Sequence, residues 1–342
     1  MKDSLLITSS PQFHHPQSTA GIMWAVTLAL LPAGIWGVYI FGIRALFVIL
    51  TAIAASIGAE ALMGLISKEQ TVRDGSAFLT GLLIGYNMPP AVPYYVVVVA
   101  SVFAIVVVKW SFGGLGANWM NPALAGRIFV FFSWTSGMTR WTLPRMAGAD
   151  TVTGPTPLGS VKSGLLSMSD SIKGPLDLLA AEGVPVTYMD LFLGKIPGSI
   201  GEVSALLLIL GGLYLMIRRI VNWEIVVSYL GSFALLVWVF GGHRYGMGFF
   251  QGDVLFHLLS GGLMLGALFM ATDMVTSPLT VKGMVVYGLG CGFMTYLLRF
   301  FGSVPEGVSL AIVFMNIFVP LMNRAFQPVK FGLIKTEKEA GK

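Results

Sequence analysis

Charged side chains are scarce in this chain of 342 residues, of which aspartate, glutamate, lysine and arginine together make up 11%. An ordinary soluble domain has about 25%, so the chain lacks the polar surface that would keep it in solution. Hydrophobic residues make up 55%, and the mean hydropathy is +0.80. This balance excludes a soluble globular protein and predicts an integral membrane protein. The net charge of +5 informs membrane orientation and does not indicate nucleic-acid binding.

Cysteine is almost absent. The single Cys291 excludes an internal disulfide and a cysteine-based metal cluster built by this chain alone, and its apolar surroundings predict a small buried side chain. Also lacking are a P-loop, a Rossmann glycine pattern and a CxxC set, so we expect no ATP, NAD or iron–sulfur cluster on this chain. The first twenty residues lack the basic-then-apolar pattern of a signal peptide, and we therefore expect the first apolar segment to be a retained span.

Long apolar segments, in contrast, are abundant. Each is a candidate to cross a hydrocarbon core of about 30 Å. The predicted spans are 21–41, 45–66, 76–88, 93–108, 118–134, 203–217, 225–240, 254–270, 283–298 and 307–322. The predicted fold is an all-α integral membrane protein with about ten transmembrane helices in two halves. Its parts are an N-terminal segment (1–20), a first membrane half (21–134), a long loop (135–198), a second membrane half (199–322) and a basic tail (323–342).

Ten spans would place both termini on one side of the membrane. The positive-inside rule selects the cytoplasm for that side, because most lysines and arginines then lie inside. The loop 135–198 is accordingly expected to be extracytoplasmic. The inner residues are Lys68, Arg73, Lys109, Arg218, Arg219, Lys282, Arg324, Lys330, Lys335, Lys338 and Lys342, and the outer ones are Arg44, Arg244 and Arg299.

A faint internal repeat supports two related halves. The segment 80–85 (TGLLIG) resembles 261–266 (GGLMLG), and each lies in the third span of its half before a proline-containing break. Two five-span halves would have opposite orientations, and inverted repeats with broken helices usually enclose a site near the membrane midplane. Chance similarity between glycine-rich apolar segments stays open as an alternative.

The loop 135–198 contains the segment 150–158, with the sequence DTVTGPTPL. Its glycine and two prolines disfavour regular structure, and its hydroxyl groups can cap neighbouring backbone. From the residues alone the segment is a turn near the membrane surface. Nothing in the composition distinguishes Thr156 from the other threonines.

The chain resembles the family formed by the RnfD component of the Rnf electron-transport complex and its homologue in the sodium-translocating NADH:quinone reductase. The resemblance rests on segment 150–158, in which Asp150, Thr153, Gly154 and Thr156 match a motif of the form Asp-x-x-Ser/Thr-Gly-Ala-Thr, while Pro155 replaces the usual alanine. It implies covalent FMN, attached through a phosphoester to the Thr156 hydroxyl by an extracytoplasmic flavin transferase. Further matching segments are 30–33, 74–77, 118–124 with 126–127, and 271–274.

Asn118 and Asn121 lie three residues apart at the start of the fifth predicted span, so they share one helix face. Buried amides are costly unless they are paired. Two interpretations stay open. The amides cap a broken helix, or, as the resemblance suggests, they contact a second, non-covalent flavin, riboflavin, on the inner side.

Three charged residues in or beside the spans are candidates for an ion path: Glu60, Arg127 and Asp273. Glu60 and Arg127 could instead pair with each other, and Asp273 could cap a helix or pair with Lys282. His257 follows Asp253 by four residues, which predicts a hydrogen-bonded pair in preference to a metal site. We therefore predict no metal site and no catalytic residue.

The resemblance implies a membrane component of an ion-translocating electron-transport complex of the ferredoxin/NAD oxidoreductase type, coupled to Na⁺ or H⁺. A component of this kind is part of a redox-driven ion translocase in a prokaryotic cell membrane and has no independent catalysis. The expected partners are an FMN-bearing subunit at the outer face, iron–sulfur subunits and the lipid bilayer. The alternative is a small-solute or ion channel or transporter with inverted repeats and no redox role; a purely structural scaffold for other subunits is a third possibility.

Overall fold

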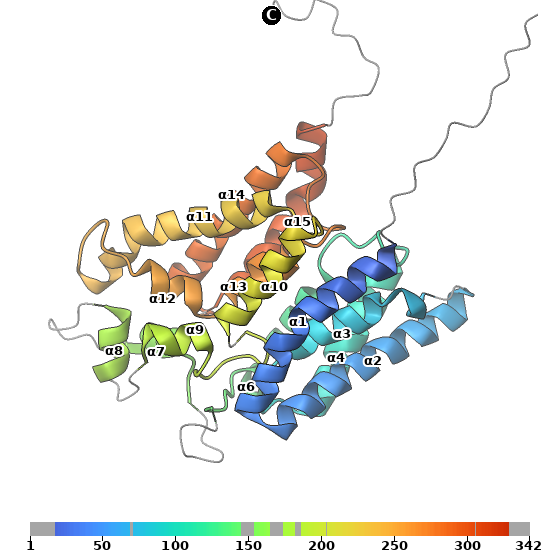
Figure 1. Ribbon diagram of the computed structural model, residues 1–342, viewed down its shortest axis with the longest axis horizontal. Helices are drawn as coiled ribbons and strands as arrows, with labels where there is room; N and C mark the ends of the chain where they lie inside the picture. Colours follow the sequence, from blue (N-terminus) through green and yellow to red (C-terminus); the bar gives the residue numbers. More distant parts are fainter. Residues whose placement is uncertain are drawn as a thin grey trace, which may run out of the picture.

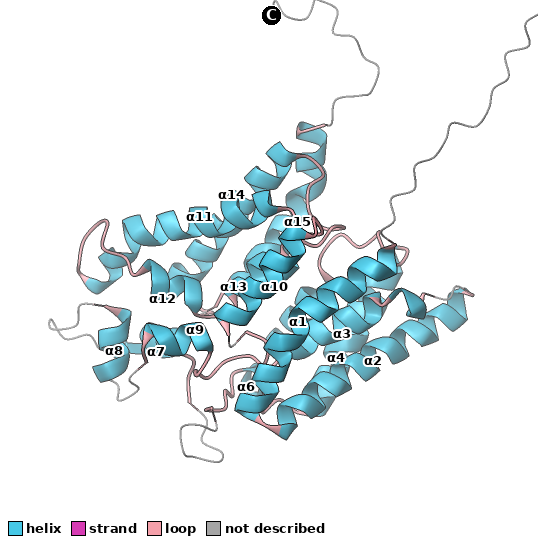
Figure 2. Cartoon of the chain, viewed as in Figure 1, coloured by secondary structure: helices cyan, strands magenta, loops and turns pink. Residues whose placement is uncertain are grey.

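The computed structural model describes residues 18–68, 71–144, 154–164, 174–181, 186–202, 204–304 and 306–327. Every regular element in these ranges is helical (Figure 2). The all-α class predicted from the sequence is therefore confirmed for the described part of the chain. Most of the predicted N-terminal segment 1–20 and of the tail 323–342 lies outside these ranges.

Six helical segments are long and apolar enough to cross a membrane, by length and composition. They are Thr19–Phe41 (α1), Ile43–Ser67 (α2), Tyr94–Phe112 (α4 with its extension), Trp223–Tyr245 (α11 with its extension), Val281–Phe301 (α14) and Val308–Ala325 (α15). The helix α4 itself covers Tyr94–Val102 and continues as a π-helix over Phe103–Lys109, and α11 covers Trp223–Phe240. These segments support a multi-pass membrane protein.

The other four predicted spans are shorter than a bilayer is thick. Three of them are α3 (Ser76–Tyr86), α5 (Pro122–Ser133) and α10 (Ala205–Ile217). At 1.5 Å per residue even the longest of these reaches only ~20 Å. The fourth is interrupted and consists of α12 (Val254–Leu259), α13 (Leu263–Leu265) and a π-helix (Gly266–Met270). The count of ten complete spans stays a prediction.

Glycines cause the interruption of the eighth predicted span. Gly261 and Gly262 adopt φ angles of 69° and 65°, a left-handed backbone that residues with a side chain rarely adopt. The chain leaves α12 at Ser260 and enters α13 directly after Gly262. The two short helices therefore end and begin inside the protein, where their free backbone groups can face a site.

The two halves lie side by side (Figure 1). Helices α1 to α4 form one group, α11, α14 and α15 form the other, and α1 packs against α10 where the groups meet. The short helices α7 (Pro157–Gly164), α8 (Pro175–Ala181) and α9 (Tyr188–Leu193) gather beside α12 at one end. Leu158, Val161 and Leu191 form a separate small core there with Phe256 of α12.

Close contact between α2 and α3 depends on Gly81. An added Cβ at Gly81 would lie 2.7 Å from Cα of Ile53 and 2.8 Å from the carbonyl oxygen of Ala52, both backbone atoms of α2. Small residues allow such close approach between helices in membranes. Gly58 in the same helix pair is exposed and has no atom within 4 Å of the corresponding position.

Replacing Gly81 with alanine is therefore expected to destabilise the protein by ~1–3 kcal/mol, because backbone atoms cannot yield as a flexible side chain can. Gly58→Ala is the matched control, and it is expected to be neutral or stabilising by up to ~1 kcal/mol through helix propensity. Thermal unfolding of both variants in one detergent measures the difference. Equal melting temperatures would contradict the assigned α2–α3 packing.

Candidate functional site

Thr156 stands directly before α7, with its side chain 5% exposed. Its hydroxyl oxygen accepts a hydrogen bond from the backbone N–H of Gly159 at 3.1 Å, and its carbonyl accepts one from Ser160 at 2.9 Å. Thr156 therefore occupies the capping position at the N-terminus of α7. This end of a helix carries partial positive charge and favours a negatively charged group such as a phosphate.

The rest of the matched motif is described only in part. Gly154 donates its backbone N–H to the carbonyl of Trp141 at 3.1 Å, which ties the motif to the segment that follows α5 and α6 (Thr135–Met138). Asp150 and Thr153 lie outside the described residues. Their predicted participation in the site stays a prediction.

A small cavity adjoins Thr156. Its walls come from four parts of the chain and include Thr156, Leu158, Ile196, Glu202, Gly262 and Glu306. An added Cβ at Gly262 would lie 2.5 Å from the Glu202 carboxylate, so the residue at the N-terminus of α13 has to be small. The cavity joins the loop before α7 to the interrupted helix of the second half.

Beneath this cavity, Arg127 of α5 links both halves through four buried hydrogen bonds. Its guanidinium donates to Glu306 at 2.6 Å and to Glu202 at 3.1 Å. It also donates to Asn87 at 3.0 Å and to Ser309 at 2.9 Å. The alternative that Arg127 pairs with Glu60 is wrong, because its acidic partners are two residues that the sequence reasoning did not select.

Glu202 reaches Arg127 because the loop before α10 runs along the end of α3. Gly201 donates its N–H to the carbonyl of Tyr86 at 2.9 Å, and Ile200 donates to the carbonyl of Met88 at 3.2 Å. These bonds satisfy carbonyl groups that α3 leaves unpaired where it stops within the protein. The same hydrogen bonds thus pair the end of α3 and hold Glu202 in position.

Glu60 belongs to a second buried network, at the opposite end of the first half. Lys109 donates to the Glu60 carboxylate at 2.8 Å and to the hydroxyl of Ser76 at 2.7 Å. Trp110 donates to Glu60 at 3.0 Å, and Thr71 also hydrogen-bonds it. Lys109, which the charge pattern assigned to the inner membrane surface, is only 2% exposed. Glu60 is fully paired, which favours a structural role.

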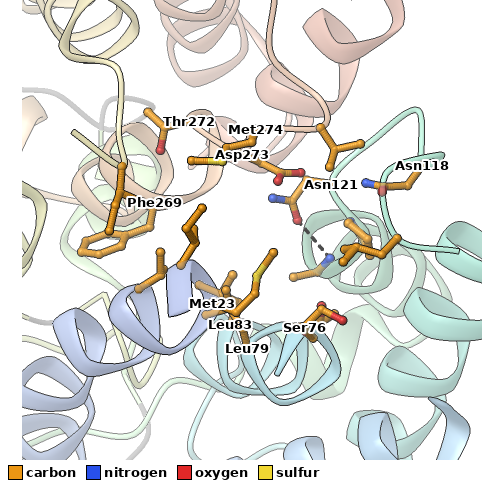
Figure 3. A pocket seen from close by; sticks show the side chains of 18 of the residues that line it. Met23, Ser76, Leu79, Leu83, Asn118, Asn121, Phe269, Thr272, Asp273 and Met274 are labelled. Atoms are coloured by element: carbon orange, nitrogen blue, oxygen red, sulfur yellow. Dashed lines mark hydrogen bonds between the residues drawn. The ribbon is translucent and has the colours of Figure 1, made fainter. Parts of the chain in front are cut away.

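The two candidate amides lie at a large cavity between the halves that is partly open to solvent (Figure 3). Asn121 caps α5 by accepting from the N–H groups of Ala123 at 3.0 Å and Leu124 at 3.3 Å. Its amide also donates to the Met270 carbonyl in the second half, at 3.3 Å. The capping interpretation is confirmed for Asn121, and its position on a cavity wall leaves the ligand interpretation open.

The same cavity collects polar groups from several elements. Asn118, Ser76 and Asp273 point toward its open centre, with Phe269 and Leu79 among the apolar walls (Figure 3). Each half contributes one π-helix to the walls, through Lys109 and Phe269 respectively, and π-helical turns are frequent at functional sites. A mostly apolar cavity with a few convergent polar groups is the usual form of a cofactor site.

Asp273 does not pair with Lys282 in the described part of the chain. Its carboxylate accepts a hydrogen bond from the hydroxyl of Thr276 at 3.0 Å. Its position on the cavity wall keeps Asp273 as an ion-path candidate.

Comparison with known proteins shows the family. The family model described as NQR2, RnfD, RnfE matches residues 6–332. The chain belongs to this family. The family resemblance inferred from segment 150–158 is therefore confirmed over nearly the whole chain.

Relatives within the family align end to end with this chain. The D-type component of the proton-translocating ferredoxin:NAD⁺ oxidoreductase complex of Clostridium ljungdahlii is 45% identical over 97% of both chains. Its counterpart in the Na⁺-translocating complex of Acetobacterium woodii is 40% identical over 98% of both. The counterpart in the ion-translocating oxidoreductase complex of Stutzerimonas stutzeri is 37% identical over 91% of both. Since the first two are named for different ions, similarity does not identify the ion here.

The predicted hydrogen bond between Asp253 and His257 is wrong. Asp253 caps α12 by accepting from the N–H of Phe256 at 3.0 Å, and it accepts from the Tyr188 hydroxyl at 2.7 Å. Both ring nitrogens of His257 are buried and have no hydrogen-bond partner in the described part of the chain. No cluster of metal-ligating side chains occurs among the described residues. Cys291 is buried and unpaired, as predicted.

Proposed function

We propose that this chain is the RnfD-type membrane component of an ion-translocating ferredoxin:NAD⁺ oxidoreductase complex. In this role it relays electrons through FMN bound covalently to Thr156, as part of a redox-driven translocase whose other chains hold the remaining redox groups. The observation that carries the proposal is a chain-long similarity to such components together with a Thr156 hydroxyl at the N-terminus of α7.

The surroundings of Thr156 suit a phosphoester. A flavin supplies reversible uptake and release of electrons when it is bound. The Thr156 oxygen would carry the phosphate, and the N-terminal end of α7 would stabilise its negative charge by a fraction of 1 kcal/mol or more. The hydrogen bond from the Gly154 N–H to the Trp141 carbonyl would fix the backbone that leads to Thr156. A covalent link prevents loss of the group from an exposed membrane face.

The large cavity favours a second flavin, riboflavin, bound without a covalent bond. Asn118 and Asn121 would supply amide groups, and Asp273 a carboxylate, to a flat polar ring system between apolar walls. The segment from Gly262 to Phe269 begins at the cavity beside Thr156 and ends at this cavity. At 1.5 Å per residue its length is only ~12 Å, so the two cavities are close enough for a relay.

Membrane topology and the ion path complete the proposal. We expect ten membrane-embedded segments in two inverted halves, with both termini in the cytoplasm and the Thr156 loop outside. Because Glu60 and Arg127 are paired with buried partners, Asp273 is the strongest candidate for the inner end of an ion path. Net movement of Na⁺ or H⁺ would compensate charge added to the flavins.

A channel or transporter without redox chemistry is the second candidate. The short helix α3 and the interruption between α12 and α13 favour it. The deciding experiment is the intact mass and in-gel flavin fluorescence of the denatured chain, produced with its flavin transferase. An added mass of one FMN less water, with fluorescence, is expected. A folded, membrane-inserted chain without flavin would overturn the redox proposal and favour the channel.

Asn118→Ala is expected to weaken binding of the non-covalent flavin about fivefold, since loss of one hydrogen bond corresponds to ~1 kcal/mol. The matched control is Asn222→Ala, because Asn222 is exposed and forms no capping bond. The measurement is the flavin released from the purified complex by denaturation, per mole of covalent FMN. Equal release from the two variants would place the second flavin elsewhere.

A further inference from the structure

A third cavity, at the α7 end of the bundle, lies outside the proposed electron relay. It is small and partly open to solvent, and it is lined by Lys162, Arg244, Tyr245, His257, Arg299 and Phe300, among others. Three of these side chains are cationic, and no carboxylate of the described residues lines the cavity. It is separated from the cavity beside Thr156 by Leu158, which lines both.

The positive charges around this cavity have no acidic ion-pair partner in the described ranges. Lys162 donates to the carbonyls of Arg299, Gly302 and Val304 at the end of α14. Arg299 likewise donates only to carbonyl groups, including those of His257 and Ser260. Both side chains are thus fixed by neutral acceptors. Burial, together with the charges of Arg244 and Arg299, lowers the pKa of Lys162, as expected where positive charges lie close together.

Three further groups have hydrogen-bonding capacity to spare. Arg244 is exposed, and its guanidinium lies 5.6 Å from the centre of the Phe301 ring, with no carboxylate partner in the described chain. His257 is 4% exposed, and neither ring nitrogen has a hydrogen-bond partner among the described residues. The Tyr245 hydroxyl forms no hydrogen bond within the described residues. The neighbouring Asp253 is engaged by Tyr188 and the N-terminus of α12.

A buried imidazole without a partner is costly unless something outside the chain binds it. The ring N–H of a neutral imidazole needs an acceptor, and an acceptor that also balances the charges of Lys162, Arg244 and Arg299 is an anion. A phosphate group fits, because it accepts several hydrogen bonds at once and arginine binds it strongly. We infer that this cavity binds a phosphate group, as carried by an anionic phospholipid headgroup or by free phosphate.

An exposed aromatic ring next to the cavity favours the lipid source. The Phe301 ring, in contact with the Arg244 guanidinium that lines the cavity, is 68% exposed. Exposed apolar groups next to a basic pocket between membrane helices form the arrangement in which a headgroup and its acyl chains are both contacted. The lipid would then lie against α7, the helix that begins at Thr156.

The inference is tested by thermal unfolding of the purified chain in detergent. Three additions are compared: phosphatidylglycerol, phosphatidylcholine and inorganic phosphate. The variant is Arg244→Gln, and the control is Lys195→Gln, which removes an exposed charge at the same end outside the cavity. Phosphatidylglycerol should stabilise wild type and control more than phosphatidylcholine does, and Arg244→Gln should bind it roughly tenfold more weakly.

The three additions distinguish a lipid headgroup from free phosphate as the source of the phosphate group. Stabilisation by phosphatidylglycerol alone identifies a lipid site, and stabilisation by inorganic phosphate as well identifies recognition of the phosphate group itself. Equal effects of phosphatidylglycerol and phosphatidylcholine with no effect of inorganic phosphate would overturn the inference, as would identical behaviour of Arg244→Gln and Lys195→Gln. None of these outcomes depends on whether Thr156 carries FMN.

Discussion

Thr156→Ala is expected to abolish covalent flavin attachment while the chain remains folded and inserted in the membrane. The substitution removes the only atom through which the proposed phosphoester can form at this position. It also removes the hydrogen bond from Gly159, and the loss of such a cap costs about 1 kcal/mol, too little to unfold the protein. The measurement is intact mass together with in-gel fluorescence under denaturing conditions.

Two variants separate loss of the ester from loss of the cap. Thr187→Ala removes an equivalent cap in the same loop, where the Thr187 hydroxyl accepts from the N–H of Asp190 at 3.2 Å, and it should keep its flavin. Thr156→Ser restores a hydroxyl and should be modified. Fluorescence of Thr156→Ala equal to wild type would show that the flavin is attached to another residue, such as Thr151 or Thr153.

Local signals in the sequence were sufficient for much of the fold. Length and apolarity identified the long helices, since few charges interrupt them. Capping by Asn118 and Asn121 was one of the two interpretations of the fifth predicted span's start, and Asn121 does cap α5. Such features depend on neighbouring residues alone, and they are therefore readable without the tertiary structure.

The charged networks could not be predicted in the same way. Arg127 is 75 residues from Glu202 and 179 from Glu306, and both glutamates follow glycine- or proline-containing loops that are typical of solvated positions. Lys109 ends an apolar run, which is typical of a membrane-interface lysine. These residues come together only because α3 and α5 pack against the second half. No periodicity in the sequence predicts that packing.

Competition for the Asp253 carboxylate explains why the predicted hydrogen bond between Asp253 and His257 does not form. Spacing correctly placed Asp253 and His257 one turn apart, but a residue at the start of a helix can turn its side chain to the free N–H groups of the first turn. Asp253 does so, and His257 is left without a partner. The side-chain spacing was right, while the choice of hydrogen-bond partner was decided by the helix end.

Arg127→Leu is expected to destabilise the protein by ~3–5 kcal/mol, the usual cost of leaving buried charges unpaired. The Glu202 and Glu306 side chains are 5% and 10% exposed, so neither can turn to water without disrupting the loops that hold α13 and α15. The two halves should then separate more readily. The cavity beside Thr156 and the large cavity between the halves should both lose their shape. The measurement is the melting temperature in detergent, with Arg44→Leu as the control, because Arg44 is exposed and donates one hydrogen bond to a carbonyl.

Neutralising the carboxylates tests the cause of this loss. If unpaired charge is responsible, Arg127→Leu combined with Glu202→Gln and Glu306→Gln should recover most of the stability, because no buried charge then lacks a partner. If the combined variant is as unstable as Arg127→Leu alone, the guanidinium acts through its hydrogen bonds to Asn87 and Ser309. Since Glu202 and Glu306 also line the cavity beside Thr156, recovery of stability without recovery of redox-driven ion transport would indicate that these carboxylates take part in coupling.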